Sequence, residues 1–317
     1  MKRIGIDLGG TNISIGVISE NCEISSKLVI PVKQAATGGK QSKEIIDDII
    51  SGMLNLLKAE GLTYADIDLI GIGVPGIVNA DSGVIIYTPN LELKNVPIKE
   101  IIEIKTKISV KISNDANCAA LGEVLAGSAK GAENVILLTL GTGVGAGIII
   151  DGKIYSGCYS AGGEIGHAVI AVDGRRCGCG RNGCFEAYAS ATALAKDALE
   201  TLRCYPNSFL IEICENSLDK INGKMIFEAA ASGDECAQVV VSRYIKYLGE
   251  GVITIVNIFR PEKIVLGGGI ADAGDFLIKS VNEYIKDKCM GGDLLPVPPI
   301  VKAVLGNDAG VIGAGML

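Results

Sequence analysis

Between residues 162 and 186 the chain concentrates residue types that bind metal ions. The stretch reads GGEIGHAVIAVDGRRCGCGRNGCFE and contains the single histidine of the sequence, His167, with Cys177, Cys179 and Cys184. Thiolates and a neutral imidazole are zinc ligands, and glycines let a short loop wrap a small ion. A lone histidine or cysteine is more often a packing residue, so the combination carries the inference. We predict a zinc site of three cysteines and one histidine.

Two carboxylates frame this cluster. Glu164 precedes the histidine and Glu186 follows the last cysteine. A purely structural zinc knuckle has no need of two flanking acids, so we expect this stretch to form part of a functional site.

A glycine turn near the start of the chain indicates a site for an anion. Residues 2–7 have the composition of a buried strand, and the turn LGGTN follows. After the turn, Ile13, Ile15 and Val17 alternate with polar or small residues, which is the period of a strand. A dinucleotide fingerprint or a Walker A loop opens a helix instead. The pattern therefore predicts a β-hairpin whose backbone N–H groups form an anion-binding nest.

The same pattern recurs later, and a third glycine turn follows it. LLTLGTGVGAGIII (137–150) is similar to GIDLGGTNISIGVI (5–18), and a strand leads into the triple glycine 267–269. Two hairpins can wrap phosphates, and a third turn lets a flat adenine lie against the backbone. We therefore predict a split nucleotide site and two related halves that face each other across a cleft.

The remaining chain alternates strand and helix patterns, which indicates an α/β protein. Strands are expected at 2–7, 13–17, 24–32, 68–74, 83–87, 110–113, 135–140, 144–150, 263–266 and around 300. Helices are expected at 40–60, 97–107, 116–126, 192–202, 225–231, 234–259 (with a bend at Gly249 and Gly251), 276–288 and from 308.

Composition limits the partners. Of 317 residues, 48% are hydrophobic and 21% charged, and 36 acidic against 29 basic residues give a net charge of -7. We expect no nucleic acid and no membrane as main partner. The start MKRIGIDLGG enters a strand pattern at once and leaves no room for a signal peptide, and the apolar stretch 135–150 is interrupted by glycines. With scattered cysteines, we expect a cytoplasmic protein with reduced thiols.

Six motifs together resemble the ROK family of sugar kinases and sugar-responsive repressors, most closely its bacterial glucokinases. They are DLGGT (7–11), SNDAN (113–117), LTLGTGVGAG (138–147), EIGH (164–167), CGCGRNGCFE (177–186) and IVLGGGI (264–270). The resemblance covers the whole chain. It implies the two-domain actin- and hexokinase-like ATPase fold, which is ribonuclease H-like, with a cleft between the domains. The expected domains are 1–115, a smaller α/β domain, and 116–305, a larger α/β domain with the zinc loop, while a helix at 306–317 packs back on the first.

The resemblance also implies the residues that act on ATP. Asp115 matches the catalytic base, and Asp7 matches the acid that holds Mg²⁺ through water. A carboxylate with a reference pKa of about 3.9 is a weak base for an alcohol, so Asp115 would mainly orient the hydroxyl and accept its proton late. The implied phosphate-binding residues are Gly9, Gly10, Thr11, Gly141, Thr142 and Gly143, and the implied adenosine-binding residues are Gly268 and Gly269.

The implied sugar site consists of carboxylates, amides and the histidine, which suit a ring of hydroxyls. Its residues are Asn90, Asn114, Asp115, Glu164, His167 and Glu186. With one ring nitrogen on zinc, His167 can offer the other to a hydroxyl. Zinc would hold this wall in place, since three thiolates and one imidazole leave no open position for water. One departure concerns Leu93, where the family's glucokinases typically carry tryptophan.

The implied reaction is ATP-dependent transfer of a phosphoryl group to the 6-hydroxyl of glucose. The alternative is a kinase for another sugar, namely N-acetylmannosamine, fructose, allose or mannose. A sugar-sensing regulator without catalysis is a further alternative, because the family contains both classes. The resemblance also implies a homodimer.

Overall fold

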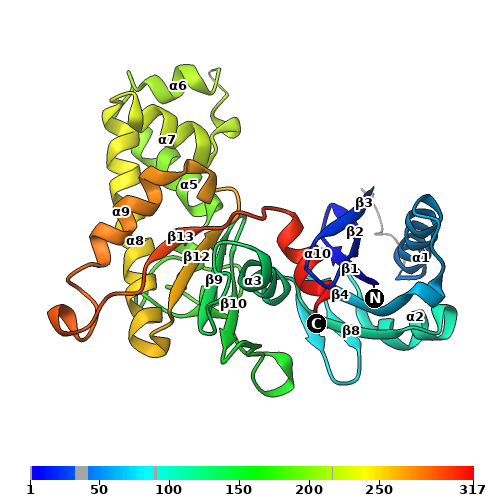
Figure 1. Cartoon of the computed structure of the whole chain (residues 1–317). Coiled ribbons are helices and arrows are strands. Elements are labelled where there is room, and N and C mark those ends of the chain that lie inside the picture. The colour runs from blue at the N-terminus through cyan, green and yellow to red at the C-terminus, as the bar shows by residue number, and fades with distance from the viewer. Residues whose placement is uncertain (1, 33–41, 89–90, 216) are drawn as a thin grey trace. The chain divides into compact units, whose positions relative to one another are not determined.

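The computed structural model describes residues 2–32, 42–88, 91–215 and 217–317 and has an α/β architecture (Figure 1). The chain divides into two compact units. Unit 1 comprises Met1–Val135, Gly147–Gly163 and Val304–Leu317, and unit 2 comprises Ile136–Ala146 and Glu164–Ala303. These units differ in extent from the domains expected from the sequence, because the helix after residue 115 packs within unit 1. The boundary at 115 stays a prediction.

Unit 1 is built on a five-stranded sheet in the order β3-β2-β1-β4-β8. Its strands are β1 (Lys2–Leu8), β2 (Asn12–Ile18), β3 (Ile24–Pro31), β4 (Ile67–Val74) and β8 (Ser109–Asn114). The first three strands pair antiparallel, which confirms the predicted hairpin, whereas β4 pairs parallel with β1 and with β8. Side chains of α1 (Ser42–Ala59) and α2 (Ile98–Thr106) share one buried apolar cluster with this sheet.

Two further helices of unit 1 meet the sheet through glycines. Helix α10 (Asp308–Gly315) packs against β1, β4 and α3 (Asp115–Ala126) (Figure 1). A Cβ atom added to Gly71 in β4 would lie 1.7 Å from the carbonyl oxygen of Ala314, and one added to Gly313 would lie 1.7 Å from that of Cys118. Only glycine permits these backbone contacts, so the final helix fits at one depth on the sheet.

The second five-stranded sheet has the order β11-β10-β9-β12-β13. Its strands are β9 (Val135–Leu140), β10 (Val144–Ile150), β11 (Lys153–Ile154), β12 (Lys263–Gly267) and β13 (Ile300–Lys302). In both sheets a hairpin and a third, outer strand stand on one side and two later strands on the other. The repeated order confirms the prediction that the opening pattern is used twice.

The helices of unit 2 are α4 (Glu186–Ala189), α5 (Ala191–Leu202), α6 (Phe209–Ile213), α7 (Gly223–Ala231), α8 (Glu235–Phe259) and α9 (Asp275–Ile285). Helices α5, α7 and α9 pack around the long helix α8 (Figure 1). Two glycines of α8, at which the sequence predicts a bend, have a packing role, and the bend stays a prediction. A Cβ on Gly249 would lie 2.2 Å from the ring of Tyr284, and one on Gly251 would lie 2.3 Å from that of Phe185.

Several short elements were not predicted. A three-stranded sheet contains β5 (Ile77–Asn79), β6 (Val84–Tyr87) and β7 (Lys94–Val96), of which the sequence indicated only β6. Strand β11 and helices α4 and α6 were also missed, because two to five residues are too few to show a hydrophobic period.

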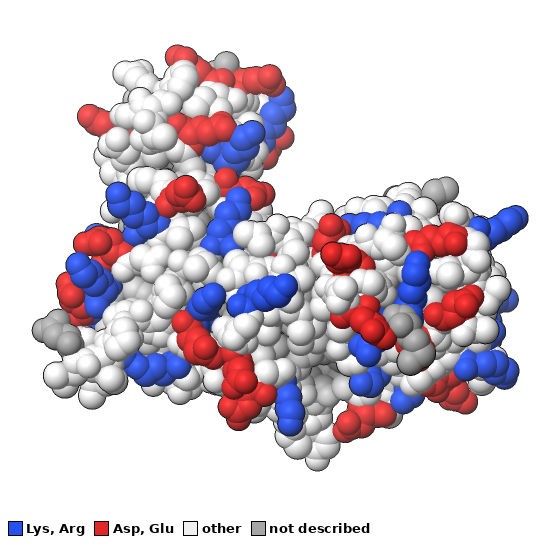
Figure 2. All heavy atoms as spheres, in the orientation of Figure 1, with Lys and Arg blue, Asp and Glu red and all other residues white. Residues whose placement is uncertain are grey.

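Charged side chains of both signs are interspersed on the visible face of each unit (Figure 2). Some of them form ion pairs, such as Lys105 with Asp47 at 3.0 Å. Among the described residues, no helix combines the length and the apolar character that a bilayer crossing requires.

The close contact at Gly71 yields a test of this packing. We expect Gly71→Ala to lower the free energy of unfolding by about 3 kcal/mol, because the added methyl group meets the backbone of α10 and neither side can yield without moving a whole element. Urea unfolding would measure the loss. The control is Ser51→Ala on the exposed face of α1. Equal stability of the two variants would contradict the account.

Candidate functional site

Polar side chains gather where the parallel strands of unit 1 end. Asp7 in β1 pairs in register with Gly73 of β4, and Gly73 pairs with Ser113 of β8. The next two residues after Ser113 are Asn114 and Asp115. Because parallel strands end at the same edge of a sheet, the structure brings three predicted site residues, Asp7, Asn114 and Asp115, to one edge.

Asp7 occupies an environment that disfavours its charge. Burial, and secondly the negative charge of Asp115, raise its pKa to about 6, while Lys27 acts in the opposite direction. Helix α10 approaches this carboxyl closely, since a Cβ on Gly310 would lie 3.0 Å from Cγ of Asp7. No sequence pattern indicated Gly310 as part of the site. Two carboxylates that repel each other at one sheet edge suit a divalent cation, which favours the ionised form of both.

The first glycine turn connects β1 to β2. The N–H of Gly9 donates to the carbonyl oxygen of Asn12 at 2.8 Å. A Cβ on Gly9 would lie 2.9 Å from that same oxygen, so the turn requires glycine there. Gly10 is half-buried and Thr11 is exposed, which leaves this turn accessible to a ligand.

Asn114 begins helix α3. Its Oδ1 accepts hydrogen bonds from the N–H groups of Ala116 at 2.9 Å and Asn117 at 3.3 Å, and its Nδ2 donates to the carbonyl oxygen of Gly76. Asn114 is therefore the N-cap, while Oδ1 of Asp115 also accepts from Ala116. The cap fixes the start of α3, and with it the backbone of Asp115.

The two glycine turns of unit 2 meet at the end of β9. Within the first, the N–H of Gly141 donates to the carbonyl oxygen of Gly143, and Thr142 is held by a hydrogen bond of 2.8 Å from Oγ1 of Thr192. Gly268 has φ +83°, and a Cβ there would lie 2.6 Å from the carbonyl oxygen of Leu140. The structure thus brings together the residues predicted for phosphates (141–143) and for adenosine (268–269).

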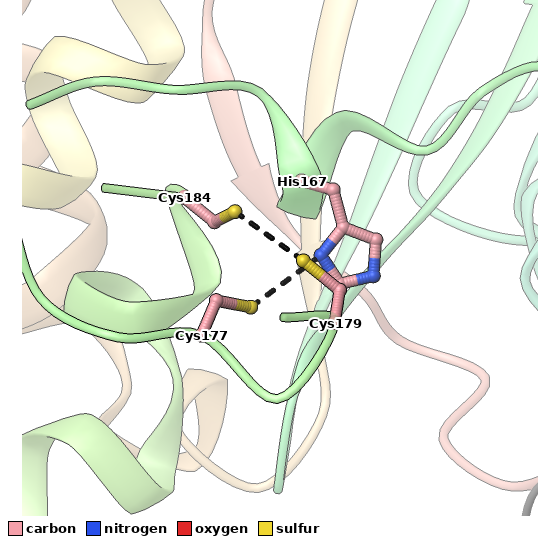
Figure 3. A group of neighbouring side chains, drawn as sticks. All are labelled: His167, Cys177, Cys179 and Cys184. Carbon is pink, nitrogen blue, oxygen red and sulfur yellow. Dashed lines mark hydrogen bonds between the residues drawn. The ribbon is translucent and has the colours of Figure 1, made fainter. Parts of the chain in front are cut away.

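His167, Cys177, Cys179 and Cys184 converge as predicted (Figure 3). Their ligand atoms all lie within 4.8 Å of one another. Sγ of Cys179 is 3.6 Å from Sγ of Cys184, and Sγ of Cys177 is 3.7 Å from Nδ1 of His167. Tetrahedral zinc with bonds of about 2.3 Å to sulfur and about 2.0 Å to nitrogen separates its ligand atoms by about 3.5–3.8 Å. The donor set and its spacing therefore fit zinc, with Nδ1 of His167 toward the sulfurs.

A carboxylate connects this cluster to the phosphate turn. Glu186 follows the last cysteine by two residues, and its Oε1 accepts from Sγ of Cys177 at 3.4 Å. Its Oε2 accepts from the N–H of Val144 at 3.1 Å, directly after the turn 141–143. Burial raises the pKa of the Cys177 thiol to about 12. The thiol is therefore protonated near pH 7, and a metal ion that binds this sulfur would release the proton.

The side-chain contacts described above do not include two residues predicted to bind the sugar, Glu164 and Asn90. Glu164 is exposed at the start of the short turn Ile165–His167, where its carbonyl oxygen accepts from the N–H of His167. Asn90 lies outside the described residues. Leu93, at the position of the family's tryptophan, is 4% exposed and belongs to the apolar cluster of unit 1.

The pKa of Asp7 gives a prediction. A carboxyl whose pKa rises on folding binds its proton more tightly in the folded state, so stability falls as pH rises from 3.8 to about 6 and stays reduced above. We expect Asp7→Asn to raise the unfolding free energy at pH 7.5 by about 3 kcal/mol and at pH 5 by about half of that. Urea unfolding at both pH values measures this, with exposed Asp81→Asn as the control. A gain independent of pH would contradict the assignment.

Comparisons with known proteins place nearly the whole chain in one family. Residues 3–317 match the model of the ROK family. A glucokinase of Halalkalibacterium halodurans is 37% identical over 99% of this chain and 94% of its own length, and a xylose repressor of Caldicellulosiruptor bescii is 32% identical over 90% of this chain and 70% of its own length. A crystal structure of a ROK family glucokinase from Streptomyces griseus in complex with glucose and AMPPNP matches with a TM-score of 0.82 and 33% identity, covering 100% of this chain and 98% of that one. The chain belongs to the ROK family.

Proposed function

We propose that this protein is an ATP-dependent sugar kinase that converts glucose to glucose 6-phosphate. The observation that carries the proposal is the match to the Streptomyces griseus glucokinase, whose structure holds glucose and AMPPNP and aligns with all of this chain. The motifs quoted from the sequence lie within that match, and the structure holds two carboxylates, glycine turns and a cysteine–histidine cluster that suit the reaction.

On this proposal the nucleotide binds through backbone groups and one carboxylate. The residues proposed for the phosphates are Gly9, Gly10, Thr11 and the turn 141–143, and those proposed for adenosine are Gly268 and Gly269. Asp7 would hold Mg²⁺, which neutralises charge on the phosphates when bound. The raised pKa of Asp7 supports this role, because a cation relieves the cost of its burial.

For the sugar we propose Asn90, Asn114, Asp115, Glu164, His167 and Glu186. Nδ1 of His167 is directed to the sulfurs, so its Nε2 is the nitrogen available to a hydroxyl. Asn114 caps α3 and has a second amide hydrogen to offer beyond the one it gives to Gly76. Zinc would supply structure alone, since its four protein ligands complete a tetrahedron and leave no site for water.

Asp115 is proposed to act on the sugar hydroxyl itself. It stands at the first residue of α3, where the helix dipole favours a carboxylate. Its role is to orient the 6-hydroxyl toward the phosphate and to accept the proton as the new bond forms. Phosphoryl transfer depends chiefly on such positioning and on neutralised charge, both of which this edge of the sheet can provide.

A coupled assay of ADP release tests the function and the sugar together. Purified protein with MgATP is supplied in turn with glucose, mannose, fructose, allose, N-acetylmannosamine and no sugar. We expect glucose to support the fastest turnover. Faster turnover with another sugar would change the proposed substrate from glucose to that sugar. Such a preference would be consistent with Leu93 at the position where the family's glucokinases typically carry tryptophan. Sugar binding detected by a thermal shift, without turnover on any sugar, would favour a sensor, as in the xylose repressor relative. Sedimentation would test the proposed homodimer.

Removal of the base is the first prediction from this proposal. We expect Asp115→Ala to lower the turnover number by about 10²–10⁴, the usual contribution of a positioned general base. Glucose binding, measured by calorimetry, should be largely kept. The control is Asp81→Ala, which removes an exposed carboxylate of the same unit. An active Asp115→Ala protein would refute the role.

Loss of a metal ligand is the second prediction. We expect Cys179→Ala to lose zinc, thermal stability and glucose affinity together, because the remaining three ligands cannot close the loop around the ion. Atomic emission measures zinc, and calorimetry measures glucose. Exposed Cys204→Ala serves as the control. Full glucose affinity in zinc-free protein would show that the metal does not hold the sugar wall.

A further inference from the structure

Arg175 lies two residues before Cys177, and its side chain is fixed by a buried carboxylate. Its Nη2 is 2.7 Å from Oδ1 of Asp197 in α5, and its Nη1 is 3.1 Å from Oδ2 of the same residue. The Asp197 side chain is 4% exposed. Such a two-point pair needs the planar guanidinium, because the ammonium of lysine is a single point of charge.

Two aromatic rings lie against the same guanidinium. Its carbon Cζ lies 4.6 Å from the ring centre of Tyr188 in α4 and 5.4 Å from that of Tyr247 in α8. The Nη1 atom also donates to the carbonyl oxygen of Ala187 at 3.4 Å. Three helices of unit 2 therefore converge on one side chain, which restrains the loop before the cysteines.

The backbone of Arg175 holds the other end of that loop. Its carbonyl oxygen accepts from the N–H of Gly183 at 2.8 Å, and Gly183 directly precedes the ligand Cys184. Its own N–H donates to the hydroxyl oxygen of Tyr188 at 2.8 Å. One residue thus restrains the chain on both sides of the cysteine loop, before Cys177 and before Cys184.

We propose that Arg175, held by Asp197, is a positioning residue that keeps the cysteine loop in its metal-binding geometry. The inference rests on the proposed zinc site. Its consequence would be kinetic: with Arg175 in place the three sulfurs stay together, so a bound ion would be released slowly. Because Glu186 follows Cys184 by two residues, the same restraint extends along the chain to the proposed sugar wall.

The test is the rate of zinc release to a colorimetric chelator in excess. We expect Arg175→Gln to accelerate release about tenfold to a hundredfold, the usual range for partners of metal ligands. Arg175→Lys should also release faster than the wild type, because it keeps the charge but loses the two-point pair. The matched control is Arg176→Gln, which removes the same charge from the exposed neighbouring residue and should release at the wild-type rate.

Function supplies a second readout. The KM for glucose of Arg175→Gln should rise with kcat nearly unchanged, and added zinc should restore it. If Arg175→Gln fails to fold because the Asp197 carboxylate is left unpaired, the double variant Arg175→Gln/Asp197→Asn removes that charge and should still release zinc faster.

Wild-type release rates in both Arg175 variants would overturn the inference, and so would a fall in melting temperature with zinc retained. Absence of zinc from the wild-type protein, by atomic emission, would instead overturn the proposed metal site on which the inference rests.

Discussion

Repulsion between two carboxylates, Asp7 and Asp115, is the physical constraint on which the edge of unit 1 depends. Three parallel strands end together and bring both groups to that edge, where burial and mutual repulsion raise the pKa of Asp7 to about 6. Helices α10 and α3 pack closely against this edge of the sheet. Gly310 allows α10 to approach Asp7, and Gly73 faces Cys118 of α3, with an added Cβ 3.3 Å from its sulfur. An edge that carries two carboxylates is suited to a divalent cation such as magnesium.

In unit 2 the corresponding organising feature is the cysteine–histidine cluster. Glu186 follows Cys184 by two residues, and its Oε2 accepts from the N–H of Val144 after the turn 141–143. A short stretch of chain therefore connects the cysteine–histidine cluster to a proposed phosphate turn. On the proposed function, a zinc ion without an open position would matter because it would fix the loop that carries Glu186 and His167.

The two hairpins and the cysteine–histidine cluster could be predicted from the sequence because each depends on a local pattern of residues. The alternation after Gly9 and Gly10 indicated a hairpin, and the similarity of 137–150 to 5–18 indicated its repetition, which both sheets confirm. The convergence of three cysteines and one histidine was predicted from residue types alone, since these residues so close together among glycines are typical of a zinc site. The roles of the site residues stay predictions.

The rest depends on contacts between distant segments, which local patterns do not contain. Gly249 and Gly251 suggested a bend because a helix rarely tolerates glycine, yet they lie against aromatic rings. Gly310 and Arg175 carried no signal either, because their importance comes from contacts with Asp7 and Asp197, which belong to other elements of the fold.

The most direct test of the central claim is the identity of the product. The protein is incubated with MgATP and glucose, and ³¹P NMR follows the γ-phosphate. We predict a new phosphomonoester signal split by the two protons on C6 of glucose, formed with one ADP for each ester. Inorganic phosphate alone, or an unchanged spectrum, would contradict the claim.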